Sequence, residues 1–183
     1  MAHALTALRL ALALPFAWWM SQGGSAAANW AALAIALAIA TDLADGPIAR
    51  RSGRASAAGR VFDHTSDFLF VTAGLVGGAL RGVFPLLLPI VIAIAFAQYV
   101  VDSYWLHRQR QLRMSALGRW NGILYFVPLC GDVLVRTGVL AALGLGVLAP
   151  LVPWIAWALV VSTLLSIGDR VLALSRTDPG SPA

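Results

Sequence analysis

Long runs of apolar residues constrain the fold of this chain more than any other feature. Six such runs have spanning or near-spanning length, and they cover approximately residues 5–20, 30–44, 68–80, 83–104, 123–143 and 147–167. A helix needs roughly 20 mostly apolar residues to cross a bilayer, and a chain that is 60% hydrophobic and 11% charged departs from the composition of soluble domains. The sequence therefore predicts an all-α fold, a polytopic membrane helix bundle of about six transmembrane helices. The third helix reaches spanning length if it begins near Ala57.

Arginine residues gather in alternate connections between these runs. The chain has no lysine, and its arginines form groups after the second, fourth and sixth runs: Arg50, Arg51, Arg54 and Arg60; Arg108, Arg110, Arg113 and Arg119; and Arg170 and Arg176. By the positive-inside rule, both termini and these loops face the cytoplasm. The asymmetry accounts for the net charge of +5 without a nucleic-acid partner, and we expect none.

The N-terminus permits two interpretations. The first 28 residues resemble a secretory signal peptide, because Arg9 precedes an apolar run and Ala26 and Ala28 are small. We expect the segment to be retained, since its removal would leave five spans and break the parity of the arginine groups. No linker or repeat divides the chain, so we predict one membrane domain over residues 1–174 and a polar C-terminal tail over residues 175–183. Cys130 lies within the fifth run and is interpreted as a packing residue.

Four aspartates within 26 residues carry most of the chemical information. Asp42 and Asp45 are spaced i,i+3, and Asp63 and Asp67 are spaced i,i+4, so on helices each pair shares one face. Each charge placed at membrane depth costs roughly 2.5 to 3.5 kcal/mol, and neighbouring carboxylates also repel. Arg50 offers one compensating charge. Hard divalent cations compensate four carboxylates more fully because they prefer oxygen ligands, which predicts Mg²⁺ or Mn²⁺.

Small residues accompany the aspartates in phase. Gly46, Ala49 and Gly59 would leave room for a nucleotide to approach the helices. The alternative is that they are contacts between packed membrane helices, where small residues are common. For the aspartates, the alternative is a position among the cytoplasmic headgroups, which accounts for one or two of them but not for four at this spacing.

The whole segment reads D-x2-D-G-x2-A-R-x8-G-x3-D-x3-D and resembles the signature of the CDP-alcohol phosphotransferases at all eight fixed positions. The resemblance implies a phosphatidyltransferase that moves a phosphatidyl group from CDP-diacylglycerol to an alcohol and releases CMP. It implies two metal ions, with the ligands Asp42, Asp45, Asp63 and Asp67. It implies that the CDP moiety is held by Asp45, Gly46, Ala49, Arg50, Gly59 and Asp63. It further implies that Asp67 is the general base for the acceptor hydroxyl, and that the enzyme is a homodimer.

Shorter segments bear on the acceptor alcohol. Residues 5–9 resemble the Asn-x-x-Thr-x-x-Arg opening of the phosphatidylglycerophosphate synthase branch, although His3 stands where Asn is usual. Residues 115–119 resemble its Ser-x-x-Gly-Lys segment with Arg119 in place of Lys, whereas Phe68 replaces a frequent Lys. These matches favour glycerol 3-phosphate, with inositol phosphate or another polar alcohol as the alternative.

An acceptor that carries a phosphate requires cationic recognition, for which arginine is well suited. The cytoplasmic position of three arginines makes them the candidates: Arg113, Arg119 and Arg170. The alternative for each of them is an ordinary positive-inside role in topology.

Charged residues also lie within the apolar runs. Asp132 and Arg136 are spaced i,i+4 in the fifth run, and we expect them to neutralise each other inside the bundle, a pocket role being the alternative. Asp102 is open to two interpretations, pairing with an arginine or lining a cavity. A membrane metal-ion transporter is the competing class of function, but it predicts polar residues at successive depths of several spans. The clustered aspartates instead favour an enzyme of the bacterial inner membrane that contacts membrane lipid and whose active site faces the cytoplasm.

Overall fold

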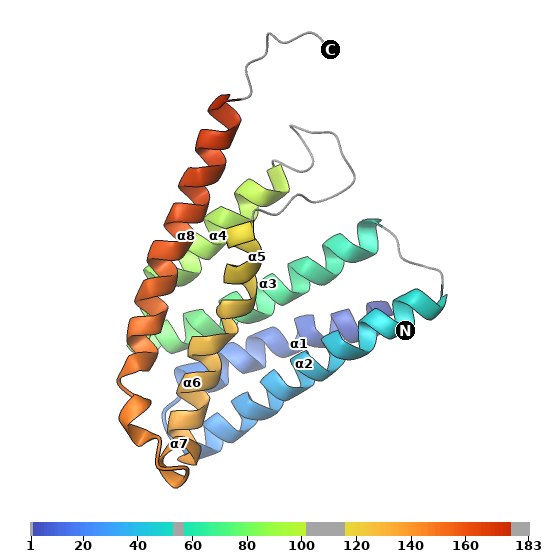
Figure 1. The fold of residues 1–183 in the computed structure, drawn as a ribbon. Coiled ribbons are helices and arrows are strands. Elements are labelled where there is room, and N and C mark those ends of the chain that lie inside the picture. The colour runs from blue at the N-terminus through green and yellow to red at the C-terminus, as the bar shows by residue number, and fades with distance from the viewer. Residues whose placement is uncertain (1, 53–56, 102–115, 177–183) are drawn as a thin grey trace, which may run out of the picture.

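The computed structural model describes the backbone of residues 2–52, 57–101 and 116–176, and the side chains at 6–43, 62, 64–101 and 117–172. Within these residues the chain is helical, which confirms the predicted all-α class. The elements are α1 (Ala2–Ser21), α2 (Ser25–Ser52), α3 (Ala57–Leu80), α4 (Leu87–Val101), α5 (Ala116–Leu124), α6 (Phe126–Arg136), α7 (Val139–Ala142), the short 3₁₀ helix η2 (Gly146–Leu148) and α8 (Leu151–Arg176). Figure 1 shows α1, α2 and α3 on one side of the bundle and α4 and α8 on the other, with α5 and α6 between them.

Two described segments are long and apolar enough to cross a membrane. They are Ser25–Leu43 and Gly146–Leu172, and Leu87–Val101 is a shorter apolar helix. The predicted number of about six transmembrane helices is therefore not confirmed. The third helix is helical from Ala57, the first residue described after Ser52, to Leu80, so it includes the second aspartate pair, as the prediction required.

The fifth apolar run is broken into pieces instead of forming one helix. α5 ends at Leu124, and α6 begins at Phe126. Pro128 explains the break, because it has no N–H group to donate to the carbonyl of Leu124, four residues earlier. α6 ends near Gly138, whose φ of 77° is a left-handed conformation that favours glycine. Cys130 is partly buried against the core, in agreement with its interpretation as a packing residue.

α1 packs closely against both α2 and α3. The ring of Phe16 stacks on that of Phe70, with centroids 4.4 Å apart. A Cβ atom added at Gly74 would overlap the Phe16 ring, and one added at Gly77 would overlap the carbonyl oxygen of Ala17. Because Gly74 and Gly77 have no side chain, the backbones of α3 and α1 can approach each other closely. This packing fixes which side chains of α1 face the aspartate-bearing helices.

A buried ionic cluster joins three helices at the end of the bundle where α1 terminates. The Arg136 Nε atom donates a hydrogen bond to Asp132 at 3.0 Å, and Arg81 lies 2.6 Å from the other carboxylate oxygen. Arg136 also donates to the carbonyl oxygens of Trp19 and Gln22 at 3.2 and 2.9 Å, and Arg81 donates to Gln22 at 3.1 Å. The predicted Asp132–Arg136 pair is confirmed, and the structure adds Arg81 and the C-terminal carbonyls of α1 to it.

Candidate active site

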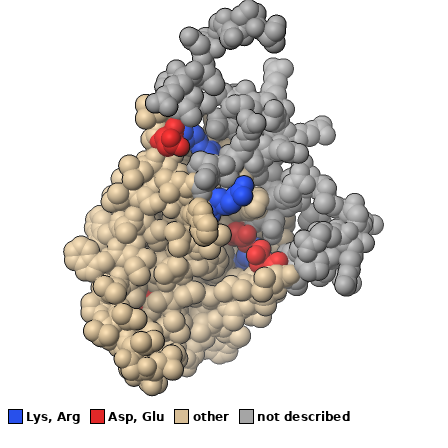
Figure 2. All heavy atoms as spheres, in the orientation of Figure 1, with Lys and Arg blue, Asp and Glu red and all other residues tan. Residues whose placement is uncertain are grey.

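A cavity of about 560 Å³ lies beside residues 38–43 of α2 and residues 64–71 of α3. Its lining residues come from seven helices, α1 to α6 and α8. On the face shown in Figure 2, most of the visible acidic and basic side chains of the described residues lie in the upper and middle parts of the molecule, and the lowest part shows almost only residues of other types. The cavity therefore combines the charged end of the bundle with an apolar interior.

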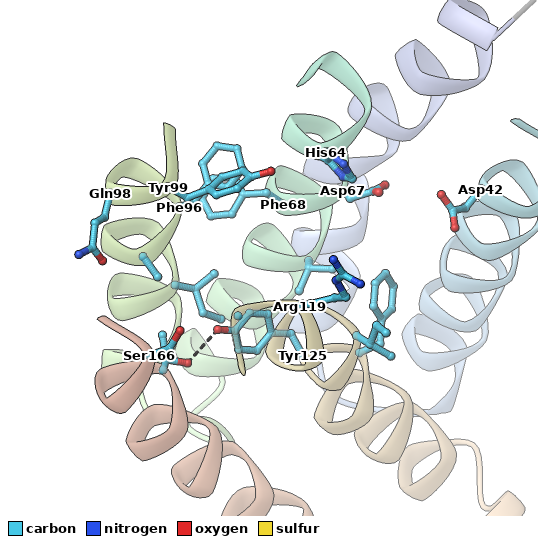
Figure 3. Close-up of a pocket in the computed structure, with 18 of the residues that line it drawn as sticks. Asp42, His64, Asp67, Phe68, Phe96, Gln98, Tyr99, Arg119, Tyr125 and Ser166 are labelled. Carbon is cyan, nitrogen blue, oxygen red and sulfur yellow. Dashed lines mark hydrogen bonds between the residues drawn. The ribbon is translucent and has the colours of Figure 1, made fainter. Parts of the chain in front are cut away.

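Two of the four motif aspartates have described side chains, and both line this cavity. Asp42 comes from α2 and Asp67 from α3, and Figure 3 shows their carboxylates pointing toward one another across the cavity. The Asp42 side chain is 57% exposed and that of Asp67 is 34% exposed. Asp45 and Asp63 lie in the same two helices, one turn nearer the α2–α3 connection, and their side chains are outside the described set. The predicted placement of the pairs on two helices is thus confirmed for the backbone.

Arg9 lies between these two carboxylates. Its guanidinium forms an ion pair and hydrogen bond with Asp67 and lies 3.8 Å from an Asp42 oxygen. It also donates to the hydroxyl of Thr41 at 3.2 Å, while that hydroxyl donates to the carbonyl of Ala38 at 2.9 Å. The Arg9 side chain is 1% exposed. The sequence alone indicates Arg9 only as part of a signal-like or branch-specific N-terminus and Arg50 as the compensating charge; the side chain of Arg50 is outside the described set.

The missed role of Arg9 has a signal in the sequence. The buried stripe of α1 consists of Thr6, Arg9, Ala13, Phe16 and Met20, which recur at the i,i+3 and i,i+4 spacing of one helix face. An arginine in phase with such a stripe must be buried, and a buried charge needs a partner of opposite sign. The pattern predicts that a carboxylate faces Arg9, but it does not say which one.

Two further cationic side chains line the same cavity. Arg119 of α5 and Arg170 of α8 both do so, and the guanidinium carbon of Arg170 lies 5.5 Å from the ring centroid of the buried Tyr99. These are two of the three arginines predicted to bind the acceptor. The third, Arg113, lies outside the described residues, as does Asp102. The structure therefore brings Arg119 and Arg170 to the same cavity as Asp67.

Aromatic rings form one side of the cavity, which we call the aromatic wall and define as Phe68, Phe96 and Tyr99. Phe68 and Phe96 stack with centroids 4.1 Å apart, and Phe96 contacts Tyr99 at 6.0 Å. Figure 3 shows the wall next to Asp67. In the sequence, Phe68 is distinguished only by the absence of a lysine at this position. The rings give the cavity a surface suited to hydrocarbon or glyceryl groups.

The fit to a divalent cation is tested by the donor atoms present. Within the part of the chain whose side chains are described, no group of three or more His, Cys, Asp or Glu residues could hold a metal. Asp42 and Asp67 nevertheless supply facing, accessible carboxylates, and carboxylate oxygens are ligands that Mg²⁺ and Mn²⁺ prefer. The donor chemistry therefore fits. The residues predicted to hold CDP, namely Asp45, Gly46, Ala49, Arg50, Gly59 and Asp63, lie in α2 and α3 with side chains outside the described set.

Comparison with known proteins gives one family and one curated relative. The sequence profile of the family described as CDP-alcohol phosphatidyltransferase matches residues 1–164. A protein of Streptomyces coelicolor named cardiolipin synthase (CMP-forming) is 35% identical over 100 residues, which cover 53% of this chain and 46% of the relative. The match thus spans about half the length of that relative. No solved structure gives a significant match.

Proposed function

Because the chain belongs to the CDP-alcohol phosphatidyltransferase family, we propose that it transfers a phosphatidyl group from CDP-diacylglycerol to an alcohol and releases CMP. The observation that carries this proposal is the meeting of Asp42 and Asp67, from two different helices, in one cavity. Arg119 and Arg170 line the same cavity. Carboxylates for a metal and a base, and cations for an anionic substrate, are therefore available together.

In the proposed reaction, the acceptor hydroxyl oxygen forms a bond to the phosphorus that carries diacylglycerol. The bond from this phosphorus to the CMP oxygen breaks, and Asp67 takes the hydroxyl proton as general base. No covalent enzyme intermediate is needed. Asp42, Asp45, Asp63 and Asp67 would hold two divalent cations, which would supply electrostatic stabilisation of the diphosphate and of the departing CMP when bound. Gly46, Ala49, Arg50 and Gly59, with Asp45 and Asp63, hold the CDP moiety.

For the acceptor we propose glycerol 3-phosphate. Arg119 and Arg170, with Arg113 as a further candidate, would hold its phosphate, because paired guanidinium donors match phosphate oxygens. Their position in the cavity of Asp67 supports this assignment. Inositol phosphate is the other phosphorylated acceptor that the sequence leaves open. Its phosphate would be held by the same arginines.

Phosphatidylglycerol is a second candidate acceptor, which two observations favour. The curated relative is named as a CMP-forming cardiolipin synthase, and cardiolipin is phosphatidylglycerol that has received a second phosphatidyl group. The aromatic wall offers apolar surface beside Asp67. Both candidates share a glycerol joined to a phosphate, so one cationic pocket suits either.

The experiment is an acceptor screen with purified protein in mixed micelles of CDP-diacylglycerol, in which CMP release and the lipid product are both measured. The separate arms contain glycerol 3-phosphate, phosphatidylglycerol, inositol phosphate or no acceptor, each with Mg²⁺ and with Mn²⁺. CMP release that depends on one acceptor supports the transferase and identifies its alcohol. If no arm exceeds the control without acceptor, the transferase proposal is wrong.

We also propose that the chain is an integral membrane protein of about six spans, with the cavity facing the cytoplasm, and that it forms a homodimer. The two spanning-length helices support membrane insertion, and the cavity lies at the end of the bundle where the loops rich in arginine are predicted. Labelling of a cysteine introduced at Gly23, in the α1–α2 connection at the other end, where an added side chain meets no other atom within 4 Å, tests the orientation in intact cells. Its labelling by an impermeant reagent supports the orientation, and its protection contradicts it. Mass measurement in detergent tests the dimer.

A further inference from the structure

The ion pairs around Arg9 are asymmetric in burial. The arginine is 1% exposed, whereas the side chains of Asp42 and Asp67 are 57% and 34% exposed. A buried guanidinium depends on its carboxylate partners, because an isolated charge inside a protein is strongly disfavoured. The two aspartates, in contrast, remain accessible from the cavity. Arg9 therefore lies buried in the wall of the cavity, where it lines the site together with the more exposed carboxylates.

The position of Arg9 follows from the packing of α1 against both aspartate-bearing helices. Asp42 and Asp67 come from α2 and α3, and the guanidinium of Arg9 reaches both of them. Thr41 orients this guanidinium, because its hydroxyl hydrogen is used by the carbonyl of Ala38 and its oxygen accepts the bond from Arg9. The planar fork of arginine can serve Asp67 and Thr41 with different nitrogens, which a lysine cannot do.

We propose that Arg9 is a positioning residue that orients the Asp67 carboxylate and shares Asp67 and Asp42 with the divalent cations, so that it sets the metal affinity of the site. The inference rests on the proposed function, which takes both aspartates as metal ligands and Asp67 as the base. Arg9 has two opposite effects. Its positive charge lowers the affinity for a cation at the same carboxylates, and its hydrogen bond holds Asp67 in one orientation.

The two effects separate in a binding experiment without substrate. Mn²⁺ binding to the purified full chain is measured by electron paramagnetic resonance for the wild type, Arg9→Gln and Arg9→Lys. Arg9→Gln is expected to bind Mn²⁺ about tenfold more tightly, since a unit charge a few ångströms from the cation is removed, and to release CMP about 100-fold more slowly, since the base is no longer oriented. Arg9→Lys keeps the positive charge but loses the planar guanidinium that contacts Asp67 and Thr41 with different nitrogens. Its Mn²⁺ affinity is therefore expected to stay within about twofold of the wild-type value.

Arg136→Gln is the matched control, because it makes the same substitution in the other buried ionic cluster. Asp132 keeps Arg81 as a partner in this variant, and its Mn²⁺ affinity is expected to equal that of the wild type. A purely structural role for Arg9 predicts a different result, in which Arg9→Gln binds Mn²⁺ no more tightly than the wild type. That result overturns the proposal.

If Arg9→Gln does not fold, Arg9→Lys still decides the question. CMP release that falls at least tenfold, with a KM for CDP-diacylglycerol unchanged within about twofold and an unchanged Mn²⁺ affinity, supports positioning. Unaltered release in Arg9→Lys contradicts it. If the wild type releases CMP but Arg9→Gln has an unaltered Mn²⁺ affinity, the proposed role of Arg9 is contradicted. The proposal that the protein is a transferase is then retained. If Arg9→Gln binds Mn²⁺ more tightly but the wild type releases no CMP, the transferase proposal is contradicted. The proposal that Arg9 and a divalent cation compete for the same carboxylates is then retained.

Discussion

Two buried ionic clusters lie at opposite ends of this bundle, and both contact α1. The cavity cluster joins Arg9 to Asp42 and Asp67, and the closed cluster joins Asp132 to Arg81 and Arg136. In the closed cluster every charged side chain is between 6% and 14% exposed. In the cavity cluster the cation is buried and the carboxylates are accessible. Similar ion pairs are therefore enclosed in the interior at one end of the bundle and open to a cavity at the other.

The ratio of charges explains this difference. The closed cluster has two arginines for one carboxylate, and the excess donors are satisfied by the carbonyl oxygens of Trp19 and Gln22 at the C-terminal end of α1. A helix C-terminus carries partial negative charge, so it stabilises these cations. The cavity cluster brings one described arginine to two described carboxylates, and this local excess of negative charge supports the proposal that a divalent cation binds there. We infer that the ratio of arginines to carboxylates in each cluster, more than burial alone, distinguishes the structural ion pairs from the proposed metal site.

The largest expected effect is in the cavity cluster. Asp67→Asn removes the proposed base without changing the size of the side chain, and we expect CMP release to fall roughly 10² to 10⁴-fold. Binding of CDP-diacylglycerol should persist, as measured by retention of labelled lipid on the purified variant. Asp169→Asn is the control, because Asp169 is an exposed residue of α8 that does not line the cavity. Full activity of Asp67→Asn would remove the proposed role as base.

The second prediction concerns the closed cluster. Asp132→Asn leaves Arg81 and Arg136 buried near each other without their carboxylate, and we expect a loss of about 3 to 5 kcal/mol in the free energy of unfolding. The protein that remains folded at low temperature should keep its CMP release, since Asp132 does not line the cavity, whereas Phe126 at the start of α6 does. Thermal unfolding in detergent, followed by tryptophan fluorescence, measures the first effect. A folded variant without activity would mean that the two clusters are not independent.

A smaller effect is expected at the rim of the cavity. Arg170→Gln removes one cation proposed to hold the acceptor phosphate, which corresponds to about 1.5 to 3 kcal/mol for a hydrogen bond to a charged group. We expect the KM for the acceptor to rise between 10-fold and 100-fold, with the KM for CDP-diacylglycerol nearly unchanged. Steady-state kinetics with each substrate varied in turn separates the two constants. Equal changes in both would indicate that Arg170 does not discriminate between the substrates.

The smallest effect is expected at the aromatic wall. Tyr99→Leu keeps an apolar side chain but removes the ring beneath Arg170, and such a cation–π contact contributes about 0.5 to 1 kcal/mol. Acceptor KM should therefore rise about two- to fivefold, in the same direction as for Arg170→Gln. The double variant Tyr99→Leu with Arg170→Gln should behave like Arg170→Gln alone, because Tyr99 acts through that arginine. Additive effects of the two substitutions would contradict this dependence.

Much of the fold follows from local pattern, and the exceptions have local causes too. Hydropathy correctly predicted helices in the first four apolar runs and the last, and the helical conformation of α3 from Ala57 followed from the length that the helix needs. The fifth run did not form one helix because Pro128 and Gly138 interrupt it. Hydropathy averages over a window and is insensitive to such single residues, so it overestimates helix length where they occur.

The sequence by itself determined the aspartate pairs, because spacing of three or four residues sets a shared helix face before any packing occurs. The sequence also predicted that Arg119 and Arg170 lie on the cytoplasmic side of the membrane, as the aspartates do. Only the tertiary structure decided that Arg9 joins Asp42 to Asp67 and that Phe68 stacks on Phe96. Arg9 lies 32 residues from Thr41 and 58 from Asp67 in the chain, and no local spacing encodes such a meeting. It arises from the close packing of α1 on α3, where Gly74 and Gly77 let the two backbones approach.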